Sequence, residues 1–311
     1  MGKLAFLFPG QGSQYVGMGS DLFQSFPVFS KAMREADARL GFPLSRICFD
    51  GPEEKLTLTA NTQPAILAHS VGVWRLIESE GLTPDVVAGH SLGEYSALVA
   101  AGCISLSDAA FAVRRRGEMM QEAVPVGEGT MAAILGLDAE TMSGICRQAA
   151  EGEVVEPANL NCPGQIVIAG HVGAVGRALG LAREKGARRA IQLQVSAPFH
   201  SSLMKPAQDG MIGVLEKIEF SDLIFPLINN ADVELITTGE MAKAGLIKQI
   251  VSPVRWEETV LKMIGMGVDT FVELGPGKVL SGLVKRVDRK ARCLNVEDAE
   301  SLQSNLAELK G

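Results

Sequence analysis

Short apolar runs alternate with longer segments whose apolar residues recur at helical spacing along most of the 311-residue chain. The runs predict buried strands at 4–8, 86–88, 225–228, 270–274 and 292–296. Helical spacing predicts helices over 62–81, 94–101 and about 106–123, and we expect Thr62 to cap the first of them, with Pro64 in its first turn. This alternation is typical of an α/β protein with a mainly parallel sheet.

The middle of the chain follows a different order. Strands are predicted at 130–135, 154–160, 165–169 and 190–195, and helices at 139–150 and 172–185. The order β-α-β-β-α-β is that of a ferredoxin-like unit. We therefore predict a small ferredoxin-like domain, residues 127–197, inserted in a large discontinuous α/β domain formed by residues 1–126 and 198–311.

The segment Gly89-His90-Ser91-Leu92-Gly93 places a serine between a predicted strand and a predicted helix. G-x-S-x-G in this setting is a nucleophile elbow, a strained turn that holds the hydroxyl above the sheet edge. Side chains at 89 and 93 would crowd the turn and the close strand–helix contact. The backbone N–H of Leu92 can donate to a developing oxyanion. The alternative is that Ser91 serves only as the N-cap of the helix.

The loop 9–14 follows the first strand and contains Gly10 and Gly12. A dinucleotide site is rejected because the glycine pattern lacks its third member. Such a loop can instead bring the backbone N–H of Gln11 next to the elbow as a second oxyanion donor.

A serine nucleophile needs a base, and the chain has four histidines. His69 lies within a predicted helix, His171 follows a strand in a turn, and a strand-like backbone directs His90 away from Ser91. His200 lies on an irregular segment where the chain returns from the small domain, a suitable place for a site in a cleft. Its neutral imidazole could take the serine proton, although a lone loop histidine remains the alternative.

No acid is evident as a partner for the imidazole. Asp108, Glu118 and Asp138 lie between the serine and the histidine, and their spacing selects none of them. Either a carboxylate is supplied by the fold, or amide and carbonyl groups orient the ring.

Three consecutive arginines lie in the predicted helix 106–123. Arg114 and Arg115 both have Glu118 within helical reach, whereas Arg116 lies on the apolar face without a nearby acid. A snorkelling side chain is one interpretation. Because a buried unpaired guanidinium is costly, a ligand carboxylate or phosphate is the interpretation that we favour.

Composition narrows the class of protein. A hydrophobic content of 47% is enough for a large core, and a net charge of −7 argues against nucleic acid as the main partner. Five scattered cysteines without C-x-x-C argue against a disulfide framework and a structural zinc, and we expect no metal. The apolar runs are too short for a signal peptide or a membrane span, so we expect a cytoplasmic protein without membrane association, and a monomer.

Several motifs occur in a defined order over essentially the whole chain. They are Phe8-Pro9-Gly10-Gln11-Gly12-Ser13-Gln14, Gly89-His90-Ser91-Leu92-Gly93-Glu94, Asn159-x-Asn161-Cys162-Pro163-Gly164-Gln165, Ala197-Pro198-Phe199-His200-Ser201, Ser252-Pro253-Val254-Arg255-Trp256 and Glu273-Leu274-Gly275-Pro276-Gly277. With this set the chain resembles the malonyl-CoA:acyl carrier protein transacylase family. The resemblance implies a hydrolase-like α/β core with an inserted ferredoxin-like lobe.

The resemblance also implies roles for single residues. Ser91 would be acylated and His200 would be its base, with Gln249 helping to orient the histidine. Gln11 and Leu92 would form the oxyanion hole, Arg116 would bind the malonyl carboxylate, and Phe199 would exclude an α-methyl group.

The implied reaction moves malonyl from malonyl-CoA to the phosphopantetheine thiol of an acyl carrier protein, as the supply step of fatty-acid synthesis. No cofactor of the chain's own is implied, because the partner carries the phosphopantetheine. A serine thioesterase or hydrolase with the same elbow is the alternative, and a non-enzymatic carrier-binding subunit is another. Carrier docking needs a local basic face, for which the runs 183–189 and 285–292 are both candidates. For each run a solvated helix end is an equally good interpretation.

Overall fold

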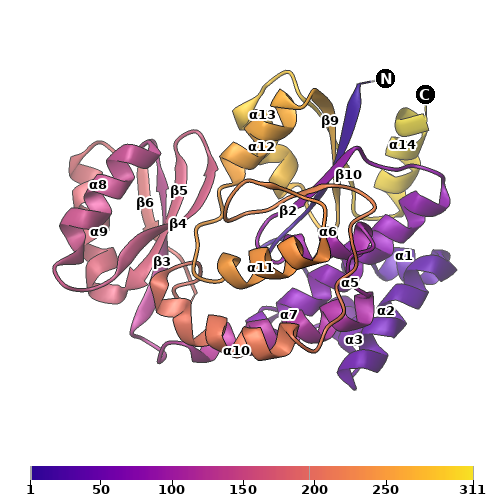
Figure 1. The fold of residues 1–311 in the computed structure, drawn as a ribbon, viewed down its shortest axis with the longest axis horizontal. Helices are drawn as coiled ribbons and strands as arrows, with labels where there is room; N and C mark the ends of the chain where they lie inside the picture. Colours follow the sequence, from indigo (N-terminus) through magenta and orange to yellow (C-terminus); the bar gives the residue numbers. More distant parts are fainter. Residues whose placement is uncertain (1, 196, 311) are drawn as a thin grey trace.

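The protein has a large lobe and a small lobe, each built on its own sheet (Figure 1). The computed structural model describes residues 2–195 and 197–310, and within these ranges the strands form a six-stranded and a four-stranded sheet. The larger sheet has the order β10-β9-β1-β2-β7-β8, and only the pair β7–β8 in it is antiparallel. Its strands are β1 (Lys3–Phe8), β2 (Val86–Gly89), β7 (Leu227–Ile228), β8 (Leu235–Ile236), β9 (Val268–Leu274) and β10 (Arg292–Val296). The predicted mainly parallel sheet is therefore confirmed.

Alternation along β1 directs side chains to two apolar cores, one on each face of the sheet. Phe6 and Phe8 pack into the core that contains α5, α6 and α7, whereas Ala5 and Leu7 face α12 and α13. The helices of this lobe are α1 (Ser20–Ser25), α2 (Pro27–Leu40), α3 (Leu44–Asp50), α4 (Glu53–Leu56), α5 (Thr59–Ser79), α6 (Gly93–Ala100), α7 (Leu106–Glu122), α10 (Lys205–Leu215), α11 (Gly239–Gln249), α12 (Trp256–Gly265), α13 (Val279–Val287) and α14 (Ala299–Lys310), with a 3₁₀ turn at Ser202–Met204.

The helix α5 starts earlier than the sequence pattern predicts. It begins at Thr59, so Thr62 lies inside it rather than capping it, and Pro64 lies within the helix. Proline cannot donate to the carbonyl four residues earlier, that of Ala60. Arg114 Nη1 of α7 donates to that carbonyl instead, at 3.1 Å, which compensates for the missing bond.

The small lobe is the predicted ferredoxin-like unit. Its elements are β3 (Gly129–Leu135), α8 (Ala139–Ala150), β4 (Val155–Cys162), β5 (Gln165–His171), α9 (Val172–Glu184) and β6 (Arg189–Gln192). Its sheet has the order β4-β5-β3-β6 with every neighbouring pair antiparallel. The last strand is shorter than predicted, since it ends at Gln192. The boundaries at 126/127 and 197/198 stay a prediction.

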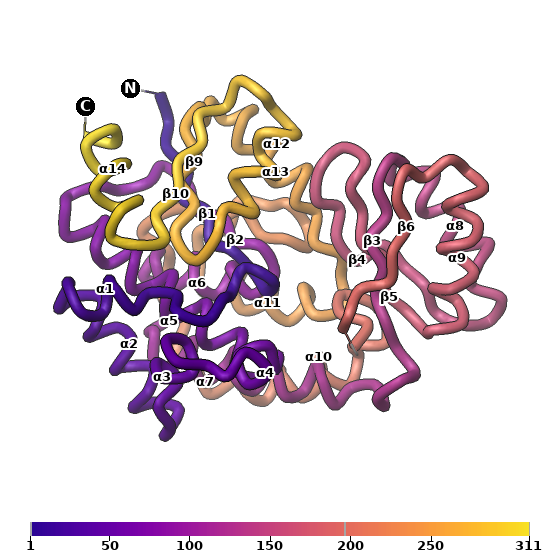
Figure 2. Tube along the Cα trace, turned by 180° about the vertical axis from the view of Figure 1, so that it is seen from behind, coloured from indigo at the N-terminus to yellow at the C-terminus, as the bar shows by residue number. Residues whose placement is uncertain are grey.

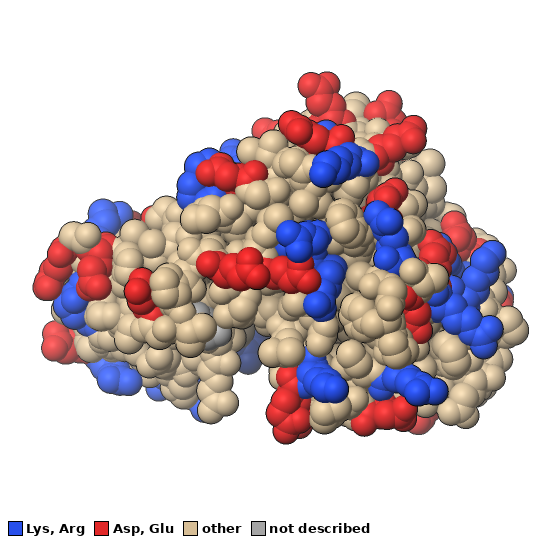
Figure 3. All heavy atoms as spheres, turned by 90° about the horizontal axis from the view of Figure 1, so that it is seen from below, with Lys and Arg blue, Asp and Glu red and all other residues tan. Residues whose placement is uncertain are grey.

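The two lobes meet along the outer strand of the small sheet. Leu160 N donates to Val254 O and Val254 N donates to Ala158 O, both at 2.9 Å, so a segment of the large lobe is hydrogen-bonded to β4. From behind, β4 lies next to α12 and α13 (Figure 2). A view from below shows a notch between the lobes, with acidic and basic side chains intermixed over that face (Figure 3). None of the described helices is long and apolar enough to cross a membrane.

Candidate active site

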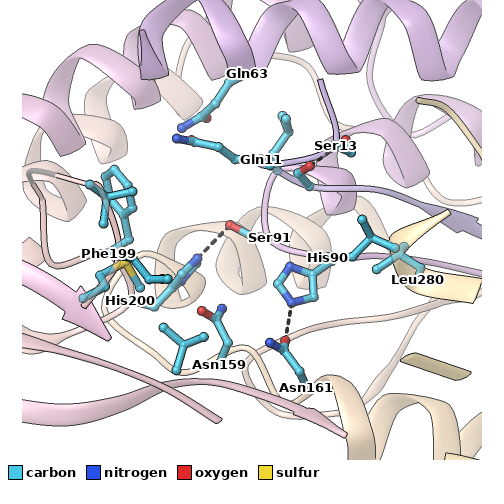
Figure 4. A pocket seen from close by; sticks show the side chains of 18 of the residues that line it. Gln11, Ser13, Gln63, His90, Ser91, Asn159, Asn161, Phe199, His200 and Leu280 are labelled. Atoms are coloured by element: carbon cyan, nitrogen blue, oxygen red, sulfur yellow. Dashed lines mark hydrogen bonds between the residues drawn. The ribbon is translucent and has the colours of Figure 1, made fainter. Parts of the chain in front are cut away.

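A cavity of about 290 Å³ lies where the lobes meet, at the carboxyl ends of β1 and β2. These two strands are parallel neighbours with Phe8 opposite Gly89, so the loops that follow them lie side by side. The cavity is lined by Gln11, Ser91, Phe199 and His200, which Figure 4 shows. Leu92 and Arg116 also line it. The seventh predicted site residue, Gln249, is fully buried and is hydrogen-bonded to Arg116 and His200.

The elbow has the geometry that its glycines predict. Ser91 has a φ of 51°, in the left-handed region that a serine rarely adopts. A Cβ on Gly89 would lie 1.9 Å from the backbone carbon of Gly93, and a Cβ on Gly93 would lie 2.0 Å from the carbonyl oxygen of Phe8. The predicted steric requirement at both positions is confirmed.

We expect Gly93→Ala to lower the free energy of unfolding by about 3 kcal/mol or more, because the added methyl meets backbone atoms that cannot move away. The matched control is Gly180→Ala in α9, where an added Cβ would have no neighbour within 4 Å. That change should raise the free energy of unfolding by roughly 0.5–1 kcal/mol. Urea unfolding of both variants tests this, and equal stability of the two would contradict the steric argument.

Ser91 and His200 point toward one another across the cavity (Figure 4). Ser91 Oγ lies 2.7 Å from His200 Nε2, within the range of a strong hydrogen bond. The serine hydroxyl therefore does not cap α6, and the N-cap alternative is wrong. His200 is buried, with a φ of 60°.

The imidazole is oriented by a main-chain carbonyl. His200 Nδ1 lies 3.0 Å from the carbonyl oxygen of Gln249, so the neutral ring donates there and keeps Nε2 as an acceptor for the serine. The carboxylates of Asp108, Glu118 and Asp138 are engaged elsewhere, in cap hydrogen bonds and surface ion pairs. Of the two alternatives that the sequence left open, the carbonyl is the one that the structure contains.

Burial, with the Arg116 charge as the next cause, lowers the pKa of His200 to about 3. The ring is then neutral at pH 7 and can accept a proton. Because its pKa is lowered on folding, the folded chain binds fewer protons here than the unfolded chain between about pH 6.5 and 3. The contribution to stability is full above that window and is lost as the pH falls through it.

We therefore expect the ¹⁵N signals of His200 to show a neutral imidazole, protonated on Nδ1, down to about pH 5 in the folded protein. In urea the same residue should titrate near pH 6.5. A midpoint near 6.5 in the folded protein would contradict the lowered pKa.

The Arg116 guanidinium is buried, with 1% of the residue exposed. It donates to Gln63 Oε1 at 2.8 Å, to Gln249 Oε1 at 2.9 Å and to Ser91 Oγ at 3.1 Å. Its Nε has no hydrogen-bond partner among the described residues. All three acceptors are neutral, and Arg116 has no ion-pair partner in contact among the described residues. Burial therefore lowers the pKa of the guanidinium, although Tyr95 and Glu94 raise it in part. Arg116 is thus available to a ligand anion beside the nucleophile.

The neighbouring arginines behave as their spacing predicts. Arg114 Nε lies 2.7 Å from Glu118 Oε1, and Arg115 also pairs with Glu118. Neither lines the cavity.

Two backbone amides are available for an oxyanion. Within the described part of the chain, neither Gln11 N nor Leu92 N donates to a protein acceptor, although both residues line the cavity beside Ser91. Free donors at this position suit an acyl-transfer intermediate.

The sequence reasoning missed three polar residues that contact the predicted set: Gln63, Glu94 and Asn230. Asn230 follows β7, the neighbour of β2, and its Oδ1 accepts from Ser91 N at 2.7 Å. Glu94 is fully buried, and burial raises its pKa to about 7. Glu94 follows the elbow directly in the sequence, which is the one local signal that could have identified it.

His90 lines the cavity but turns away from Ser91, and its Nε2 lies 2.9 Å from Asn161 Oδ1 (Figure 4). Its ring also packs on Trp256. His69 and His171 lie outside the cavity. No group of three or more His, Cys, Asp or Glu in the ranges 2–195 and 197–310 is arranged to hold a metal ion.

An elbow serine beside a histidine and two free amides, on this α/β fold, is the site of a serine enzyme that works through an acyl ester, a class that contains both acyltransferases and hydrolases. In agreement, the family model described as "Acyl transferase domain" matches residues 5–305. The malonyl CoA-acyl carrier protein transacylase of Bacillus subtilis is 51% identical over 311 residues, which are 100% of this chain and 98% of the relative. The chain therefore belongs to the malonyl CoA-acyl carrier protein transacylase family.

Solved structures agree with this assignment. An acyl carrier protein S-malonyltransferase from Vibrio cholerae has a TM-score of 0.95 and 49% identity, and covers 97% of this chain and 99% of its own. A malonyl-transacylase in complex with the acyl-carrier protein of a type II polyketide synthase has a TM-score of 0.96 and 46% identity, and covers 98% of this chain and 99% of its own. These likenesses confirm the hydrolase-like core with its small lobe.

Proposed function

We propose that this enzyme transfers malonyl from malonyl-CoA to the phosphopantetheine thiol of an acyl carrier protein, through a malonyl ester of Ser91. One juxtaposition carries the proposal: Ser91 Oγ lies 2.7 Å from His200 Nε2 and 3.1 Å from the buried Arg116. A base and a fixed cation within hydrogen-bond distance of one hydroxyl suit a nucleophile whose substrate has both a thioester and a carboxylate.

In the first half-reaction, His200 Nε2 takes the proton of Ser91 as its oxygen attacks the thioester carbon. The carbonyl oxygen becomes an oxyanion that the amides of Gln11 and Leu92 stabilise, and loss of one such donor typically costs about 3–4 kcal/mol. The intermediate collapses by breaking the carbon–sulfur bond, and His200 returns the proton to the CoA thiolate. In the second half-reaction the carrier thiol gives its proton to His200 and its sulfur attacks the ester carbon. The bond between that carbon and Ser91 Oγ then breaks, and His200 returns the proton to the serine oxygen.

Arg116 would select malonyl by pairing with its free carboxylate. An acetyl group would leave the buried guanidinium without an anion, a larger penalty than a lost methylene, which is worth about 1–3 kcal/mol. Phe199 lines the cavity beside His200 and would occupy the space that an α-methyl group needs.

The proposal extends to the setting of the reaction. The serine, base and cation all come from one chain, which supports a monomeric catalyst. The chain would need no cofactor of its own, since the phosphopantetheine arrives on the partner. We place the enzyme in the cytoplasm, in the supply of malonyl units for fatty-acid synthesis.

Intact-mass spectrometry after mixing with malonyl-CoA tests the function. We expect the mass to increase by one malonyl group, and the adduct to disappear when carrier protein is added, with the malonyl group recovered on the carrier. A hydrolase with the same elbow would instead release free malonate without carrier. That result, or no adduct at all, would overturn the proposal.

A further inference from the structure

The carboxylate of Glu94 is buried three positions after Ser91 in the chain, and the reaction described above does not use it. Glu94 is in the first turn of α6, where a negative charge is favourable, and 1% of the residue is exposed. Its Oε2 accepts from Asn230 N at 2.9 Å and from Gln249 Nε2 at 3.0 Å.

Asn230 connects this carboxylate to the elbow. Its Oδ1 accepts from Ser91 N at 2.7 Å, and its Nδ2 donates to Gly89 O at 2.7 Å. The strained backbone of Ser91 is therefore held from the side of β7 by a residue whose own main chain is bound to Glu94.

Gln249 connects the same carboxylate to the cation and the base. Its Nε2 donates to Glu94 Oε2 and also to Ser91 O, at 3.0 Å each, while its Oε1 accepts from Arg116 Nη2 at 2.9 Å. Its carbonyl oxygen lies 3.0 Å from His200 Nδ1. Two acceptors on one side and a donor-only guanidinium on the other leave one favourable orientation for this amide.

We propose that Glu94 is a positioning residue that aligns Ser91, His200 and Arg116 through Asn230 and Gln249. This inference rests on the proposed malonyl transfer. The length of the Glu94 side chain is what matters, because it lets one oxygen accept from two buried donors. One donor belongs to Asn230, which holds the elbow, and the other to Gln249, which contacts His200 and Arg116. No acid contacts His200 directly among the described residues. Glu94 is instead linked to it through Gln249, whose side chain donates to Glu94 and whose carbonyl orients the imidazole.

Two conservative variants of Glu94 separate the effect of side-chain length from the effect of charge. Glu94→Gln keeps the length and an acceptor oxygen but removes the charge, whereas Glu94→Asp keeps the charge and shortens the side chain. Ser96→Ala is the matched control, because Ser96 is buried in the same helix and its Oγ has no partner among the described residues. The readouts are the acylation rates with malonyl-CoA and with acetyl-CoA, measured on protein shown to be folded by thermal unfolding.

We expect Glu94→Asp to slow acylation by malonyl-CoA about 100-fold, as for misplacement of reacting groups by roughly 1 Å, and to reduce the preference for malonyl over acetyl. Glu94→Gln and Ser96→Ala should stay close to the wild-type rate and preference. Wild-type behaviour of the Asp variant, or an equal loss in the Gln variant, would overturn the positioning role. Failure of the wild-type protein to form a malonyl adduct would instead overturn the proposed function itself.

Discussion

Replacement of Ser91 by alanine should abolish the malonyl adduct, with acylation slowed by at least about four orders of magnitude. The change removes the proposed nucleophilic atom, Ser91 Oγ. It leaves the hydrogen bond from the backbone N–H of residue 91 to Asn230 Oδ1, so the elbow should keep its shape. Intact-mass spectrometry after incubation with malonyl-CoA measures the loss directly.

Ser96→Ala is again a suitable control, since it removes a buried hydroxyl from the adjacent helix without a hydrogen-bond partner among the described residues. It should be labelled like the wild type. An adduct that persists in Ser91→Ala would mean that another side chain is acylated, and the assignment of the nucleophile would then be wrong.

Replacement of Arg116 by alanine should reverse the acyl preference rather than simply inactivate the enzyme. Malonyl transfer should fall by about three orders of magnitude, because the malonyl carboxylate would enter a buried site without its cation. Transfer from acetyl-CoA should rise, because that substrate no longer leaves a buried guanidinium unpaired. The measurement is the ratio of acylation rates with the two thioesters.

Arg115→Ala provides the comparison within the same helix. Its side chain is 43% exposed and pairs with Glu118 at the surface. Removal of such a pair changes stability by at most about 1 kcal/mol and should leave the acyl preference unchanged. If Arg116→Ala also kept the wild-type preference, the proposed carboxylate clamp would be refuted.

Local sequence was sufficient to predict nine of the ten described strands, five of the fourteen described α-helices and the elbow. Strand and helix periodicities come from residues close together in the chain, and the requirement for glycine at 89 and 93 arises within one turn and its neighbouring strand. The sequence also predicted that Arg116 binds an anionic ligand, because the helix period places Arg116 on the apolar face without a nearby acid.

Only the tertiary structure decided how these groups are held. The histidine is oriented by the carbonyl of Gln249, and every residue has a carbonyl, so the sequence offers no pattern that selects this one. In α5 the carbonyl left free by Pro64 accepts from Arg114 of another helix, and Asn230 and Glu94 meet across 136 positions of the chain. Contacts between distant segments depend on how the sheet orders its strands, and strand order is a property of the folded chain as a whole.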